Sequence, residues 1–395
     1  MKKRLIVLIV VLSLLLAACA QPQQAPAPAP TPPADGGAAA DTAPPAGEGG
    51  LTFGNIRLAF VHVGDPADMG YTYRQHRGTT DMMLELGIHP DQVLNFFNIP
   101  PGGAADTAIL EAIEWGADMV FATSFGHGPH MLEAARAHPD VNFFHATGDL
   151  ALDAGLPNFH NYFGNMSQAR YLSGIAAGLR TETNVLGFVA AHPFAEVITG
   201  FTAFYKGALS VNPDVTMYVM FMNAWNNPAL EAQIAQALID RGADVIGQHA
   251  DSPSAQGVAQ NNGVWSVGYN ANMIPAAPGA VLVSPMFDWS YYLTYAVYEF
   301  VTNGNVRTDF LGSMEPGGQG MVFLSALNPN EGVVAEGTAE AIAAAEGAII
   351  AGRNIFTGPI YDNEGNQILA EGEEWTERQS APSWSYIVQG ITVIE

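Results

Sequence analysis

The sequence contains one cysteine, Cys19, in 395 residues. A single cysteine excludes an intramolecular disulfide and a metal cluster held by several thiolates of one chain. The fold must therefore rest on its cores, and 48% of the residues are hydrophobic and 10% aromatic. That composition excludes global disorder, and the length suggests two or three domains.

Basic residues are scarce as well. Lys and Arg number 14 against 38 Asp and Glu, which gives a formal net charge of −24. A surface this acidic repels phosphate backbones and anionic lipid headgroups, so it disfavours nucleic-acid binding and charge-driven binding to a membrane surface.

Long hydrophobic runs are missing, apart from residues 5–16, which follow a basic start at residues 2–4. The run is too short for a typical membrane-spanning helix, which needs about 20 residues, and it has the pattern of a signal peptide. It ends in Leu-Ala-Ala before Cys19, which resembles the bacterial lipobox. We expect residues 1–18 to be a lipoprotein signal peptide and Cys19 to carry lipid at the extracytoplasmic side of the cell membrane. The alternative is an ordinary secretory signal or an uncleaved anchor.

The segment after Cys19 cannot form a core. Residues 20–50 contain eight prolines and no Val, Ile, Leu or aromatic residue. Such a composition is typical of a semi-extended tether, which we place at residues 19–53.

From residue 54 onward, strand-like apolar runs alternate with helical stretches. Repeated units of this length predict an α/β fold with parallel sheets, and two successive sets predict two lobes. The pentapeptides at 116–120 (Gly-Ala-Asp-Met-Val) and 242–246 (Gly-Ala-Asp-Val-Ile) recur at matching points of the two sets, as helix-ending glycines before a buried strand. The expected strands are 56–63, 93–97, 119–123 and 142–146, then 185–190, 217–222, 245–248 and 264–269. The expected helices are 73–86, 104–115 and 129–137, then 168–180, 193–210, 228–241 and 254–261.

Ligands of open α/β sheets bind beyond the carboxyl ends of the strands, so the loops there are the candidate site. These loops are aromatic and almost free of Lys and Arg, which favours a planar or sugar-like neutral solute over a phosphorylated one. Their aromatic residues include Tyr71, Tyr73, Phe125, Phe194 and Trp225, and Trp289 follows a later strand-like run. Their polar residues are Glu196, Asn223, Asn226, Asp251, Asn270 and Asn272.

Catalytic alternatives have weaker support. The sequence has no Gly-x-Gly-x-x-Gly after a strand, no Walker loop and no Gly-x-Ser-x-Gly. Glu196 and Asp251 could form an acid–base pair, although Asp251 could instead cap the helix at 254–261. His127 and His130, with histidines elsewhere, could contribute to a metal site, but zinc needs three or four converging ligands.

Several segments, in this order and spacing, resemble the basic membrane protein (BMP) family of substrate-binding lipoproteins of ABC transporters, and within it the subgroup of purine uptake. The resemblance covers most of residues 55–375. The segments are 70–73 (GYTY), 123–126 (TSFG), 145–148 (HATG), 169–174 (ARYLSG), 210–214 (SVNPD), 237–244 (ALIDRGAD), 248–253 (QHADSP) and 356–360 (FTGPI).

The resemblance implies a type I periplasmic-binding fold, with two doubly wound parallel-sheet lobes joined by three hinge strands. Lobe one would comprise residues 54–160 and about 285–320, and lobe two 161–284 and about 321–395. The crossings would lie near 158–165, 281–288 and 321–327. The protein would be a monomer without cofactor or metal. It would capture a solute between its closing lobes, deliver it to an ABC permease and catalyse no reaction.

The resemblance also assigns site residues. Tyr71 stands where relatives carry an aromatic ring, often Trp, that stacks on the base, and Phe125 lines the same pocket. Trp225, Asp251 and Trp289 match further pocket positions. With Glu196, Asn223 and Asn272 from the loops, these form the predicted site.

Two departures from the family affect the expected ligand. Relatives that bind nucleosides carry an acid after the strand at 142–146, and its absence here favours a free purine base. Asn272 replaces an aspartate, so the edge that the site recognises differs, because an amide both donates and accepts. Nucleoside or sugar binding, a sensor without transport, and an exported hydrolase remain the alternatives.

Overall fold

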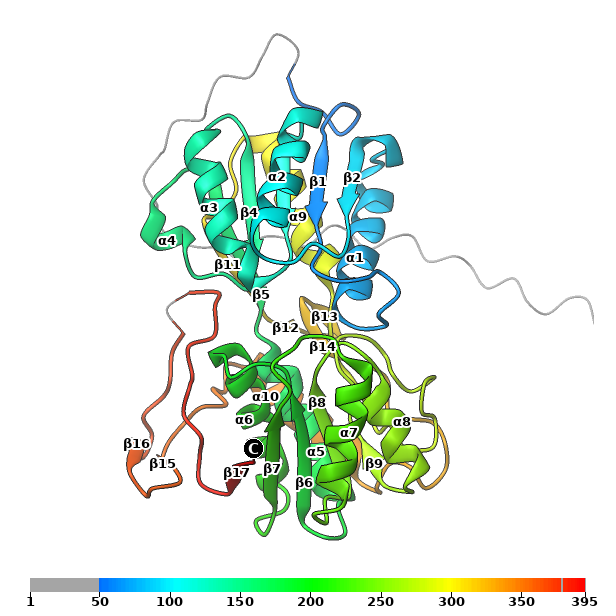
Figure 1. Cartoon of the computed structure of the whole chain (residues 1–395). Coiled ribbons are helices and arrows are strands. Elements are labelled where there is room, and N and C mark those ends of the chain that lie inside the picture. Colours follow the sequence, from blue (N-terminus) through cyan, green and yellow to red (C-terminus); the bar gives the residue numbers. More distant parts are fainter. Residues whose placement is uncertain (1–49, 378, 395) are drawn as a thin grey trace, which may run out of the picture. The chain divides into compact units, whose positions relative to one another are not determined.

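The structure is a computed structural model that describes residues 50–377 and 379–394 (Figure 1). The predicted signal peptide, Cys19 and nearly all of the predicted tether lie outside the described residues. Within the described part, no helix has the length and apolar character needed to cross a membrane.

Within the described residues, the first sheet has six strands in the order β11-β5-β4-β3-β1-β2, all parallel. We call this sheet and its helices lobe 1. Its strands are β1 (Leu58–Val61), β2 (Val93–Phe96), β3 (Met119–Ala122), β4 (Asn142–Ala146), β5 (Phe159–Gly164) and β11 (Asp309–Gly312).

Helices cover both faces of this sheet. On β1, Leu58 and Phe60 belong to one core, whereas Ala59 and Val61 belong to another, as the two-residue period of a strand requires. Helices α1 (Tyr71–Leu86) and α9 (Trp289–Asn303) supply the first core, and α2 (Gly103–Trp115) and α3 (Gly128–Ala137) the second. The short helix α4 (Ala151–Ala154) and the 3-10 turns η1 (Pro90–Gln92) and η2 (Phe125–His127) complete this lobe.

The second sheet and its helices form lobe 2. In the described part of the chain its order is β17-β7-β6-β8-β9, again parallel. Its strands are β6 (Val185–Ala190), β7 (Thr216–Phe221), β8 (Val245–His249), β9 (Trp265–Ser266) and β17 (Ile391–Ile394). Its helices are α5 (Met166–Arg180), α6 (Ala195–Leu209), α7 (Pro228–Ile239), α8 (Ser254–Asn261) and α10 (Thr338–Ile350).

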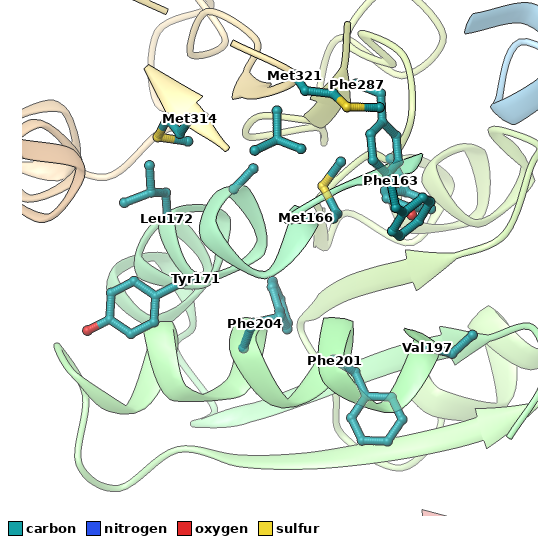
Figure 2. Packing of buried hydrophobic residues seen from close by; sticks show 14 of the residues in the cluster. Phe163, Met166, Tyr171, Leu172, Val197, Phe201, Phe204, Phe287, Met314 and Met321 are labelled. Carbon is teal, nitrogen blue, oxygen red and sulfur yellow. The ribbon is translucent and has the colours of Figure 1, made fainter. Parts of the chain in front are cut away.

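Helices α5 and α6 approach each other at backbone distance. A Cβ on Gly174 of α5 would lie 1.9 Å from the carbonyl oxygen of Phe204, and one on Gly207 of α6 would lie 1.9 Å from that of Tyr171. Figure 2 shows Tyr171 on α5 with Phe204 and Phe201 on α6 in this core. Glu196 lies in the first turn of α6, so the packing of α6 against α5 also positions the backbone of Glu196.

Three segments connect the two lobes. The first runs from β5 into α5 at residues 164–166. The second and third run through β10 (Pro285–Phe287) and β14 (Val322–Leu324), which pair antiparallel. Short strands β12 (Met314–Glu315) and β13 (Gln319–Gly320) precede β14, and β15 (Ile360–Tyr361) and β16 (Gln367–Leu369) lie in the C-terminal segment.

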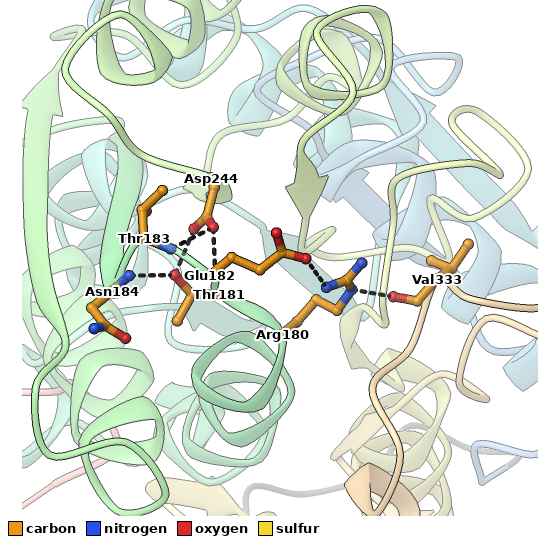
Figure 3. A network of polar contacts seen from close by, with 7 residues as sticks. All are labelled: Arg180, Thr181, Glu182, Thr183, Asn184, Asp244 and Val333. Atoms are coloured by element: carbon orange, nitrogen blue, oxygen red, sulfur yellow. Dashed lines mark hydrogen bonds and ion pairs between the residues drawn. The ribbon is translucent and has the colours of Figure 1, made fainter.

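The recurring pentapeptides occupy matching places in the two lobes. Gly116 and Gly242 both have positive φ, 89° and 94°. Asp118 accepts a hydrogen bond from the backbone of Arg57 just before β1 (2.8 Å), and Asp244 accepts from the backbone of Glu182 and Thr183 just before β6 (2.6 and 2.9 Å). Figure 3 shows the Asp244 network. Each carboxylate thus satisfies backbone donors where a central strand begins.

Candidate functional site

A cavity with about 340 Å³ of empty space, part of it open to solvent, lies where strands of both lobes end. Lobe 1 contributes Val63, Tyr71, Thr123, Ser124, Phe125 and Thr147, and lobe 2 contributes Glu196, Trp225, His249, Asp251 and Tyr269. None of the described residues that line it is a lysine or arginine.

The ring of Tyr71 is held from behind. Its hydroxyl donates to the carbonyl oxygen of Thr123 (2.7 Å) and accepts from Gln75 Nε2 (3.1 Å). The ring meets Trp289 edge to face at 5.6 Å. Burial raises the pKa of Tyr71, so the hydroxyl is neutral. Because its polar atom is already partnered within lobe 1, Tyr71 presents mainly a flat aromatic surface to the cavity.

Aromatic rings from both lobes meet at the rim. Phe125 of lobe 1 lies 5.5 Å from Phe194 of lobe 2, centroid to centroid, and both rings are about 40% exposed. Phe194 stacks on His192 (5.0 Å), and Trp225 lies 4.8 Å from His192. The contact between Phe125 and Phe194 therefore bridges the two lobes beside the cavity.

Asp251 is the most deeply buried carboxylate of the cavity, at 7% exposure. Its Oδ1 accepts from Asn270 Nδ2 (3.2 Å), and the carboxylate also accepts from the backbone N–H of Tyr71, across the lobes. Burial, with a smaller contribution from Asp68 and other nearby carboxylates, raises the pKa of Asp251 well above its ordinary value. Asp251 does not cap α8, so that alternative is wrong: the N-cap is Pro253, without a side-chain hydrogen bond.

Glu196, His249 and Tyr269 form the opposite wall. His249 Nε2 lies 3.4 Å from Glu196 Oε1 and 3.3 Å from the Tyr269 hydroxyl. Burial lowers the pKa of His249, which favours the neutral ring. The Arg170 guanidinium lies 3.6 Å from the Tyr269 ring centroid and donates to the carbonyl oxygen of Gln248 (2.6 Å), so it fixes this wall from behind.

Of the eight predicted ligand-binding residues, five line this cavity: Tyr71, Phe125, Glu196, Trp225 and Asp251. The other three lie elsewhere. Trp289 is fully buried and stacks on Phe287 at 4.4 Å, so it supports Tyr71 from the core of lobe 1. Asn223 is exposed, in a turn with φ 53°, and Asn272 is exposed with its Oδ1 accepting from the backbone of Ile274 (3.1 Å).

The prediction missed His249, Tyr269 and Thr147 as wall residues. All three lie at the end of a strand or strand-like run, where the sequence places the site. Thr147, with φ 61°, is the residue that follows β4. Its hydroxyl is buried and has no hydrogen-bond partner among the described residues.

The histidines considered for metal binding have other partners. His127 Nε2 lies 2.8 Å from the carbonyl oxygen of Ile99, and His130 bonds Asp106 (2.6 Å) and the backbone of Gly102 (3.0 Å). Among the described residues, no three His, Cys, Asp or Glu side chains converge in a way that could hold a metal ion. What the cavity offers is aromatic surface for stacking and carboxylates that accept hydrogen bonds.

Comparison of the sequence with known proteins identifies a family and its relatives. Residues 56–313 match the family of PnrA-like ABC transporter substrate-binding proteins. The chain is 31% identical over 340 residues to a purine-binding protein of Brucella abortus, covering 85% of this chain and 93% of that protein. It is 32% identical over 319 residues to a protein of Haloferax volcanii named as a candidate glucose-binding protein of an ABC transporter, covering 80% and 77%.

Solved structures show the fold. A solute-binding protein of an ABC transporter system from Conexibacter woesei has a TM-score of 0.60 at 17% identity, covering 75% of this chain and 97% of that one. One from Aeropyrum pernix also has 0.60, at 16% identity, covering 75% and 92%. The predicted type I periplasmic-binding fold is confirmed. On its sequence match, its fold and its interlobe cavity, the chain belongs to the Bmp family of ABC transporter substrate-binding proteins.

Proposed function

We propose that this solute-binding protein captures a purine, as base or nucleoside, between its two lobes. ABC substrate-binding proteins act outside the cytoplasm and are not enzymes, so the chemistry to explain is recognition. The interlobe cavity carries the proposal, because its described lining has aromatic rings and carboxylates and no lysine or arginine. The Brucella abortus relative, which is named as purine-binding, adds to its support.

In this proposal the purine stacks against Tyr71 and Phe125, with Trp225 on the side of lobe 2. Asp251 and Glu196 accept hydrogen bonds from the N–H groups on its edge. Asn223 and Asn272 were predicted to serve that edge, but in this structure both are exposed away from the cavity. Closing the lobes buries the solute and brings Phe125 against Phe194, which gives the permease a closed shape to recognise.

Sugar binding is the second candidate, because the Haloferax volcanii relative is equally similar and is named for glucose. Aromatic faces and carboxylates also suit pyranose rings. The distinguishing property is the flat conjugated edge of a purine, which a sugar lacks.

A thermal-shift screen separates these candidates. The protein is unfolded and refolded to remove bound solute, and then tested with adenine, guanine, hypoxanthine, xanthine, their nucleosides and a set of sugars. A ligand at 100 times its Kd should stabilise the fold by about 2.7 kcal/mol. Shifts with purines alone support the proposal, whereas shifts with sugars alone would replace purine by sugar as the solute.

We further propose that lipid on Cys19 holds the protein at the membrane, near its permease. Two or more acyl chains give stable anchoring, since each buried CH₂ contributes roughly 0.8 kcal/mol. A Cys19→Ser variant should leave the membrane fraction, and its recovery there after cleavage of the signal peptide would overturn this assignment.

A further inference from the structure

A cavity on the surface of lobe 2 has no part in the proposed recognition of the solute. It is lined by the last turn of α6, by residues of the segment 353–357, and by Tyr171 and Glu374. It contains about 970 Å³ of empty space, part of it open to solvent. Its described lining shares no residue with that of the solute cavity.

Two cationic side chains line this cavity. They are Lys206 of α6 and Arg353, which follows α10. Lys206 is the only lysine of the chain outside residues 2–3. Burial, with a smaller contribution from the charge of Arg353, lowers the pKa of Lys206 to about 8. Because like charges repel, this placement is unfavourable unless negative charge offsets it.

The described part of the protein does not supply that negative charge. Neither Lys206 nor Arg353 forms an ion pair with a described carboxylate, although the chain has 38 acidic residues. Glu374 lines the same cavity but lies beyond ion-pair distance of both. A lysine in the last turn of α6 also complements the carbonyl groups at that end of the helix. That effect accounts for Lys206 and not for the second cation beside it.

Hydrogen-bond donors accompany the two charges. Arg353 Nη2 donates to the Tyr171 hydroxyl (3.0 Å), and the guanidinium lies 5.3 Å from the centroid of the Tyr171 ring. Tyr171 thus orients Arg353, and its own O–H has no acceptor among the described residues. The three N–H donors of Lys206 likewise find no acceptor there. A tetrahedral oxyanion has both the charge and the acceptor oxygens that this set of donors requires.

We propose that this cavity binds a small, doubly charged oxyanion, such as sulfate or hydrogen phosphate, between Lys206 and Arg353. The Tyr171 hydroxyl donates a further hydrogen bond to it. The net charge of −24 repels an extended anionic surface, whereas two adjacent cations attract a single small ion at contact distance. The exposed carboxylate of Glu374 limits the affinity. This site is independent of the proposed purine function.

The first test titrates sulfate into the solute-free full-length chain in detergent by calorimetry, with sodium chloride keeping the ionic strength constant. We expect saturable binding that weakens at least tenfold in Lys206→Gln and in Arg353→Gln. Arg241→Gln is the matched control and should bind like the parent, because Arg241 is an exposed arginine of lobe 2 that donates to the Ala237 carbonyl oxygen of α7. No saturable binding at millimolar sulfate, or parent-like binding in both cation variants, would overturn the proposal.

Two further variants keep the test decisive if Lys206→Gln does not fold. Glu374→Gln removes an exposed carboxylate from the cavity and should tighten sulfate binding by roughly threefold or more, since one repulsive charge is gone. Tyr171→Phe keeps the aromatic ring and should weaken binding by roughly threefold to tenfold, as expected for one lost hydrogen bond. Unchanged sulfate affinity in both variants would place the anion outside this cavity.

Discussion

At the scale of single residues, some side chains of the cavity face the solute, and others fix the position of those that do. The Tyr71 hydroxyl donates a hydrogen bond to the Thr123 carbonyl oxygen and accepts one from Gln75. The Tyr71 ring also contacts Trp289 edge to face. The ring is therefore fixed before any solute arrives, which reduces the entropy lost on binding.

Tyr71→Ala should weaken binding of the cognate purine by roughly 1–3 kcal/mol, the range measured for stacking of bases on aromatic residues in nucleic-acid binders. Tyr71→Phe is the control, since it keeps the ring and should retain most of the affinity. Calorimetric titration of both variants measures the difference. Parent-like affinity in the alanine variant would place Tyr71 outside the contact surface.

Asp251 should make stability depend on pH. Burial raises its pKa above the ordinary value of about 3.9, so the folded state holds the proton more tightly than the unfolded state. This contribution is present at low pH and is lost as the pH rises from about 4 through the folded pKa. Asp251→Asn, which cannot titrate, should lose less stability than the parent between pH 4 and pH 7 in thermal unfolding. Parallel curves would show that Asp251 has an ordinary pKa.

The residues that sequence reasoning misplaced share a local cause. The side-chain oxygen of Asn272 accepts a hydrogen bond from the backbone N–H of Ile274, two residues later, a local bond that asparagine side chains form readily. Asn223 adopts a left-handed turn conformation that points its side chain to solvent. A pattern of polar residues after strands locates the site. It does not show which of these side chains bind their own loop backbone or turn to solvent instead of facing the cavity.

At the scale of elements, periodicity predicted most of lobe 1 and lobe 2. Strand β6 and helix α8 have the predicted bounds. Helices α1, α2 and α3 each begin within two residues of their predicted first residue. The edge strands β11 and β17 were not predicted as strands. Both pair with strands distant in the sequence, β5 and β7, so their conformation depends on neighbours and leaves little local pattern.

Gly174 should be essential to lobe 2. Because its Cβ would lie 1.9 Å from the Phe204 carbonyl oxygen, Gly174→Ala forces α5 and α6 apart and should lower stability by about 1–3 kcal/mol or more. Gly257 lies inside α8 with nothing within 4 Å of its Cβ, so Gly257→Ala should instead stabilise by up to about 1 kcal/mol. Thermal unfolding of the pair tests this, and equal midpoints would show that the two helices can separate without cost.

At the scale of the whole described part, residues 50–377 and 379–394, contacts between the lobes define a closed state. Phe125 meets Phe194 at the rim, and Ser380 of the C-terminal segment donates to Asp309 of β11 (2.7 Å). A Cβ on Gly70 of lobe 1 would lie 2.1 Å from the carbonyl oxygen of Asp251 of lobe 2. This close approach of the two lobes therefore depends on a glycine.

Gly70→Ala should separate closure from folding. The three nearest atoms that a Cβ on Gly70 would meet all belong to Asp251 of lobe 2, so parting the lobes removes the closest obstruction. The ligand-free variant should keep the parent's unfolding midpoint, because each lobe retains its own core. Its affinity should fall by roughly tenfold or more, since overpacking at a rigid contact costs about 1–3 kcal/mol and only the closed state has that contact.

Gly103→Ala is the matched control, because Gly103 is the first residue of α2 and a Cβ there would have nothing within 4 Å. Small-angle scattering should show ligand-induced compaction in the parent and the control but less in Gly70→Ala. Full compaction and parent affinity in that variant would mean that the lobes bind the solute without approaching this closely.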